Sequence, residues 1–184
     1  MGMPKARGLA MLQCLRSSFN RRSMEGAALP TDDSERVTAE DMLCVDLGDG
    51  VLRMHAVATR RGEPGGAYLE WIDVWIKLTV RGIQAEGAWS VMPDELRGFV
   101  QQIRTMHEQL RPGLRAELSG VEPGFDLRLE ALERGAIVGD WRFQPLPPDG
   151  AWVAGHCGLD QSYLPEWIRG IESFLASSAS NRSP

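Results

Sequence analysis

Alternating side chains between residues 68 and 80 constrain the fold of this chain more than any other feature. Residues two positions apart lie on the same face of a β-strand. One face of this strand is aliphatic, and the other carries two tryptophans among polar residues. The first face holds Ile72, Val74, Ile76, Leu78 and Val80, and the second holds Trp71, Asp73, Trp75, Lys77 and Thr79. The pattern predicts the central strand of a sheet that is covered by helices or a loop on at least one side.

The composition is that of one globular domain. The chain has 184 residues, of which 43% are hydrophobic and 24% charged, enough to bury a substantial core. Its charges are unevenly distributed, because Met1 to Met24 contains five basic residues and no acid, whereas Glu25 to Asp49 contains eight acids and one arginine. The remainder is nearly balanced. The folded part therefore does not offer the basic surface that a nucleic-acid-binding protein needs.

The chain divides into three parts. We expect residues 1–40 to be a disordered leader, first basic and then acidic, because no periodicity persists through them. The start of the chain has no acids and is rich in Arg and Ser, which also fits an organellar transit peptide. Composition alone supports a transit peptide less well than it supports a disordered leader. Residues 42–178 are expected to form a single domain, followed by a flexible tail over 179–184. No apolar run has the length of a transmembrane helix, so we expect no membrane contact.

Strand and helix patterns follow one another along the expected domain. The expected strands are, in order, 51–60, 68–80, 83–90, 114–121, 125–134, 136–144 and 151–158. One helix is expected from Pro93 to Leu110 and another after Asp160, which has the position of an N-cap. Short connections favour antiparallel pairing. The predicted fold is therefore α+β, a single domain built mainly on an antiparallel β-sheet of about six to seven strands with two covering helices.

The helix from Pro93 to Leu110 is the clearest element in the sequence, with an apolar stripe at helical spacing. We expect this stripe to cover a face of the sheet, namely the face that presents Trp71 and Trp75. Burying two indoles would outweigh most surface contacts, at roughly 25 cal/mol per Å² of apolar area. The alternative is that these two tryptophans stay exposed and meet a partner.

Several segments resemble a known family. They are the Trp-containing strand, the helix DELRGFVQQIRTM, a strand after Pro112-Gly113, the hairpin FDLRLEALERGAIVGDW and the closing DQSYLPEWIRGIESFL. In this order, they resemble a group of small bacterial domains of unknown function that includes the immunity proteins of the WapI type. The resemblance implies an antiparallel sheet with helical cover, no enzymatic activity, and tight binding of a partner toxin. It supplies no motif residues that mark a binding site.

The sequence contains no catalytic or metal-binding signature. Its three cysteines are widely spaced without a CxxC pair, which predicts neither a disulfide framework nor a zinc site and favours a reducing compartment, the cytoplasm. His156 and Cys157 are adjacent and offer the one candidate for a thiol enzyme, but neighbours in a strand point to opposite faces. His55 and His156 lack a third ligand at suitable spacing. We therefore expect no metal and no cofactor.

Surface recognition remains as the favoured function. Aromatic residues are the usual anchors of protein interfaces, and the chain has six tryptophans. The candidate contact patch consists of Trp71, Asp73 and Trp75. Three functions stay open: a cytoplasmic, non-enzymatic binding protein of the immunity type, a thiol enzyme or hydrolase using His156 and Cys157, and a structural subunit whose tryptophans pair with a second copy.

Overall fold

The computed structural model describes residues 42–61, 70–147 and 149–180, all within one compact unit, Val37–Pro184. The leader expected over 1–40 lies outside the described residues. So do residues 181–184 of the expected tail, whereas the last helix continues to Ser180.

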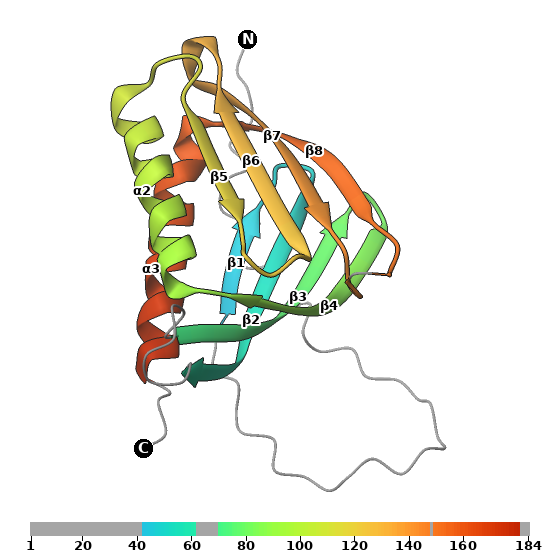
Figure 1. Cartoon of the computed structure of the whole chain (residues 1–184). Helices are drawn as coiled ribbons and strands as arrows, with labels where there is room; N and C mark the ends of the chain where they lie inside the picture. Colours follow the sequence, from blue (N-terminus) through green and yellow to red (C-terminus); the bar gives the residue numbers. More distant parts are fainter. Residues whose placement is uncertain (1–41, 62–69, 148, 181–184) are drawn as a thin grey trace, which may run out of the picture. The chain divides into compact units, whose positions relative to one another are not determined.

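The described strands form two antiparallel sheets of four strands each (Figure 1). Sheet A contains, in spatial order, β1 (Met42–Asp46), β2 (Gly50–Arg61), β3 (Glu70–Val80) and β4 (Ile83–Val91). Sheet B contains, in spatial order, β5 (Arg115–Ser119), β6 (Phe125–Ala131), β7 (Ala136–Phe143) and β8 (Val153–Asp160). The helices are α2 (Pro93–Gln109) and α3 (Leu164–Ser180), and the 3-10 turns are η2 (Glu133–Gly135) and η3 (Gln161–Tyr163).

The predicted α+β class, the antiparallel pairing and the two helices are confirmed. The structure differs in having two sheets, and in having β1 as an additional strand. At five residues, β1 is too short for a periodic pattern to stand out in the sequence. Pro93 begins α2 as expected, and the Asp160 carboxylate accepts a hydrogen bond from the Ser162 backbone N–H at 2.7 Å.

One hydrophobic core joins both sheets and both helices. Aromatic rings connect the two sheets directly, because Trp89 of β4 lies edge-on to Phe125 of β6 with ring centroids 5.6 Å apart. Phe125 in turn contacts Phe143 of β7 at 6.4 Å. The inner faces of the sheets therefore cover each other.

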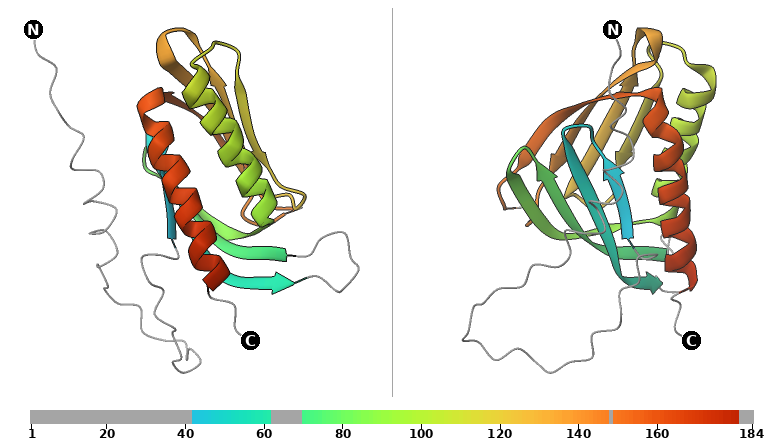
Figure 2. Two further views of the ribbon diagram at one scale, coloured as in Figure 1. Left: turned by 90° about the vertical axis from the view of Figure 1, so that its left-hand side faces the viewer. Right: turned by 180° about the vertical axis from the view of Figure 1, so that it is seen from behind.

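The helices lie side by side along one end of the two sheets (Figure 2). Helix α2 runs beside edge strand β5, where the Gln102 side chain accepts a hydrogen bond from the Glu117 backbone N–H at 2.7 Å. Helix α3 runs beside edge strand β1, where the Trp167 indole donates to the Asp46 carbonyl at 3.2 Å. Each helix thus covers one sheet edge that would otherwise be open to pairing.

The expectation that α2 covers the face of Trp71 and Trp75 is wrong. The buried side of β3 is the aliphatic one, and Ile72 lines a small pocket together with Pro93 of α2 and Leu175 of α3. Trp75, on the opposite side, is 43% exposed. The sequence argument assumed a single sheet whose aromatic face needed cover, whereas the second sheet and both helices all pack on the aliphatic face.

Glycines make room for large side chains where β7 pairs with β8. Gly155 lies directly opposite Trp141, and a Cβ built on Gly155 would lie 2.5 Å from the Trp141 ring. Gly139 lies opposite Cys157 in the same way, with 2.6 Å from its Cβ position to the sulfur. A methyl group at either glycine would overlap a buried side chain.

We expect Gly155→Ala to destabilise the protein by about 1–3 kcal/mol, because the added methyl forces the buried Trp141 ring to move. Gly158→Ala, on the same strand, is the matched control, since a Cβ there meets nothing within 4 Å. Urea unfolding followed by tryptophan fluorescence measures both. Equal stabilities for the two variants would contradict this account of the packing.

Candidate protein-binding surface

The outward side of sheet A carries the predicted contact residues, and we call it the tryptophan face. Trp75 is at its centre, directly opposite His55 of β2 and Ala88 of β4. Trp71 and Asp73 precede it along β3 on the same side. The tryptophan face comprises Met42, Cys44, Arg53, His55, Arg60, Trp71, Asp73, Trp75, Lys77, Glu86, Ala88 and Ser90.

Asp73 is held in place by two neighbouring strands. Its carboxylate accepts two hydrogen bonds from the Arg60 guanidinium, at 2.6 and 2.7 Å, and one from the Ser90 hydroxyl at 2.6 Å. The Arg60 hydrogen bond is the main reason that the pKa of Asp73 lies below its usual value, with Ser90 contributing and partial burial opposing. Asp73 is therefore engaged within the sheet, and its role on this face is to fix β3 between its neighbours.

A β-bulge in β2 shapes one side of the tryptophan face. The register with β3 shifts between Ala56 and Ala58, so Val57 is the extra residue. Val57 is 68% exposed, a large value for an aliphatic side chain. Bulges are frequent next to functional sites because they re-aim a side chain. Neither this bulge nor the engagement of Asp73 by Arg60 and Ser90 was visible in the sequence, since both depend on strand register.

The positive charges of Arg53 and Lys77 affect His55, which lies at the centre of the tryptophan face. The pKa of His55 lies below its ordinary value, first because of burial and then because of the positive charges of Arg53 and Lys77. His55 is therefore mainly neutral near pH 7.

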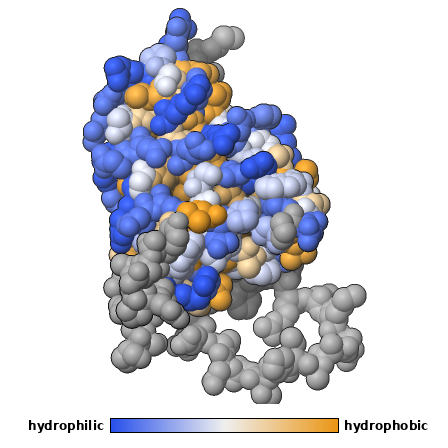
Figure 3. Space-filling view, viewed as in Figure 1, coloured by the Kyte–Doolittle hydropathy of each residue, from blue (hydrophilic) through white to orange (hydrophobic). Residues whose placement is uncertain are grey.

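The outward side of sheet B has a different character. Its charges alternate in sign from strand to strand, and one row across all four strands consists of Glu117, Arg128, Asp140 and His156. Arg128 donates to Glu117 at 2.8 Å, and His156 forms a short contact with Asp140. Figure 3 shows hydrophilic side chains over much of the side on which sheet B lies. These charges are paired with one another within the sheet.

The structure separates His156 from Cys157. His156 is exposed on the outward side of β8, whereas Cys157 is 4% exposed and belongs to the core. Burial, with a smaller contribution from the Asp140 charge, raises the pKa of the Cys157 thiol to about 11. A thiol enzyme needs a thiolate beside a base, so the pair fails both requirements. His55 and His156 lie on different sheets and do not meet as metal ligands.

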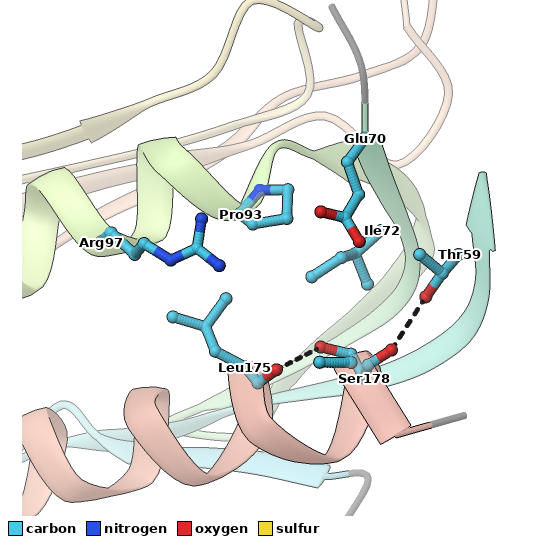
Figure 4. Close-up of a pocket in the computed structure, with 8 residues that line it drawn as sticks. Thr59, Glu70, Ile72, Pro93, Arg97, Leu175 and Ser178 are labelled. Atoms are coloured by element: carbon cyan, nitrogen blue, oxygen red, sulfur yellow. Dashed lines mark hydrogen bonds between the residues drawn. The ribbon is translucent and has the colours of Figure 1, made fainter. Parts of the chain in front are cut away.

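The pocket in Figure 4 lies between the helices and the end of sheet A. It is lined by residues that include Thr59, Glu70 and Arg97, and the Thr59 hydroxyl donates to the Ser178 carbonyl at 3.3 Å. Its volume of about 10 Å³ is the space of a single water molecule. A substrate does not fit there. Within the described ranges, no helix is long and apolar enough to cross a membrane, and no group of three or more His, Cys, Asp or Glu side chains is placed to hold a metal ion.

Residues 51–177 match the model of the Immunity protein WapI-like family. The match spans more than half of the 184-residue chain, so the chain belongs to this family, and the resemblance inferred from the sequence is confirmed.

Other comparisons are less informative. The search of curated proteins found no match. Among solved structures, the plant transcriptional regulator PBF-2 matches with a TM-score of 0.38 and 9% sequence identity, over 76% of this chain and 82% of that chain. A similarity this weak carries no argument about fold or function.

We expect Asp73→Asn to lower the free energy of unfolding by about 1 kcal/mol at pH 7, because it removes the charge that Arg60 and Ser90 bind. The folded-state pKa of Asp73 is depressed, so its contribution is fully present above the unfolded-state pKa and is lost as pH falls through the lower folded-state pKa. The gap between wild type and variant should therefore narrow as the solution is made acidic. Asp49→Asn, at a more exposed pair with Arg81, is the control. A gap that persists in acid would contradict the prediction.

We expect the Cys157 thiol to react about 100-fold more slowly than an unperturbed cysteine near pH 8, because its pKa is raised from 9.0 to about 11. Burial slows it further. A variant with Cys14 and Cys44 replaced by Ala isolates this thiol. Labelling with a thiol-specific disulfide reagent, with and without denaturant, measures the effect. Rapid labelling of the native protein would restore the thiol enzyme as an alternative.

Proposed function

We propose that this protein is an immunity-type protein that neutralises a partner toxin by binding it through the tryptophan face, without catalysing a reaction. Membership of the Immunity protein WapI-like family supports a protein partner. The Cys157 environment and the size of the pocket in Figure 4 favour binding over catalysis.

The exposed indole of Trp75 is the main reason for proposing the tryptophan face as the binding surface. It projects from a central strand, so the backbone beneath it is fixed by hydrogen-bonded partners on both sides. Tryptophans on rigid backbone are the residues that most often dominate binding energy, because they bury much area at little cost in side-chain entropy. Val57 and Ala88 add apolar surface beside it.

Sheet B offers a weaker alternative. The exposed tryptophan beside it, Trp152, directly precedes β8 and is already stacked against the Arg142 guanidinium, 4.2 Å from the ring centroid. The charges around it are paired, so a partner would have to separate them to form contacts of its own. The cytoplasmic location and the absence of nucleic-acid contacts, both expected from the sequence, are part of the proposal.

The test expresses a candidate toxic domain from a neighbouring gene in cells. We expect wild type to protect these cells and Trp75→Ala to abolish the protection. Trp152→Ala is the matched control, because Trp152 is 46% exposed and Trp75 43%. Growth on induction of the toxin gives the readout. Loss of a central interface tryptophan typically weakens binding by about 2 kcal/mol or more.

Both variants should fold, since neither Trp75 nor Trp152 belongs to the buried core, and urea unfolding checks this. Protection by Trp75→Ala equal to that of wild type would show that the partner binds elsewhere. A wild-type protein that gives no protection would count against the immunity function itself.

A further inference from the structure

Sheet A has an open edge along β4. Strands β1 and β5 have helices beside them, whereas β4 lies on the opposite side of the two sheets from both helices (Figure 1). The nine residues of β4 pair with β3 without a register shift, and they include no Lys and no Pro. Proteins usually protect an exposed edge with a lysine, a proline or a bulge. The β4 edge therefore has the features of an edge that accepts a further strand.

The turn before β4 determines which backbone groups point away from β3. Arg81 and Gly82 both have positive φ, 45° and 85°, and Val80 pairs with Ile83, as in a two-residue hairpin of type I′. Val80 and Ile83 therefore form a hydrogen-bonded pair, and such pairs alternate along antiparallel strands. The N–H and C=O groups that point away from β3 are then those of Gln84, Glu86, Ala88 and Ser90. Among the described residues, these groups have no backbone partner.

Strand β8 is the other edge without a helix beside it, and it is partly covered. The turn between β1 and β2 lies against β8, because the Cβ position of Gly48 is 2.8 Å from the Gly158 carbonyl oxygen. The β4 edge is therefore the better candidate for pairing.

Exposed apolar side chains lie beside β4. Ile83 at its start is 57% exposed, and Leu146 is 74% exposed. Leu146 directly follows Pro145, whose carbonyl oxygen is 2.6 Å from the Cβ position of Gly87 at the middle of β4. Unpaired backbone and exposed apolar side chains thus occur together along this edge, a combination typical of an interface.

We propose that two copies of this protein pair through β4 of each copy, antiparallel about a two-fold axis at Gly87, so that the two A sheets join into one continuous sheet. A two-fold contact uses the same edge of both copies, so one interface satisfies both open edges. The proposal does not depend on the toxin, and it leaves the tryptophan face of each copy uncovered.

The sequence of β4 fits pairing with itself in this register. Gly87 is the midpoint of Ile83–Val91, so an axis there pairs the whole strand. It places Glu86 opposite Ala88 of the second copy, whereas an axis at Glu86 would place two carboxylates opposite each other. It also places the exposed Ile83 opposite Val91 of the second copy, where apolar area is covered. Only an extended strand matches the outward N–H and C=O groups, and β4 itself is such a strand.

The oligomeric state of the full chain tests the proposal directly. We expect sedimentation velocity over a concentration series to show a monomer that converts to a dimer as concentration rises. A monomer up to the highest concentration that stays in solution would overturn the proposal.

Charges placed at Ala88 test the register. We expect Ala88→Glu to weaken the dimer by about tenfold in Kd, because the two-fold axis sets each new carboxylate opposite Glu86 of the second copy. Ala88→Lys, the matched control at the same exposed position, places opposite charges there and should keep the dimer at least as tight as wild type. Urea unfolding establishes that both variants are folded.

Trp75→Ala distinguishes the β4 edge from self-association through the tryptophan face. We expect this variant to dimerise with the Kd of wild type, because Trp75 stays uncovered in the proposed dimer. A dimer lost in Trp75→Ala would place the contact on the tryptophan face and overturn the proposal. Equal weakening by Ala88→Glu and Ala88→Lys, or no weakening by Ala88→Glu, would overturn it as well.

Discussion

Burial of the two inner sheet faces against each other is the constraint on which the rest of this structure depends. In β3, the core takes Ile72, Val74 and Ile76, and each fully buried aliphatic side chain contributes about 1.5–3 kcal/mol. A register slip of one residue would exchange these for Trp71, Asp73 and Trp75 and would move a carboxylate into the core. The outward position of both tryptophans and the 43% exposure of Trp75 therefore follow from the packing of the opposite face.

The two outward faces have different consequences for binding. On sheet B, alternating charges satisfy one another, and Arg142 covers Trp152. On sheet A, the exposed side chains of Trp75 and Val57 offer apolar surface. A partner gains from covering sheet B only after separating existing pairs, whereas Trp75 offers apolar area directly. The proposal of the tryptophan face as the binding surface rests on this asymmetry between the faces rather than on the number of tryptophans.

Local patterns predicted most of the fold. Alternation identified the aliphatic face of β3, Pro93 marked the start of α2, and Asp160 marked the 3-10 turn η3 that leads into α3, because these features depend on residues close in sequence. Which element covers which face depends on contacts between distant residues, such as Trp89 with Phe125. The assignment of α2 to the tryptophan face failed for that reason. The patch was visible in the sequence, but the cations that flank it and the partners of Asp73 became visible only through strand register.

The hydrogen-bond partners of Asp73 change how this residue is interpreted. As an exposed carboxylate between two tryptophans, it would be a charged contact of the interface. Instead, Arg60 from β2 and Ser90 from β4 fill its acceptor sites and connect three strands beneath the aromatic rings. Association costs less when the contacting residues are already ordered, since less conformational freedom is lost. Asp73 thus orders the tryptophan face in advance, which leaves Trp75 as the proposed direct contact.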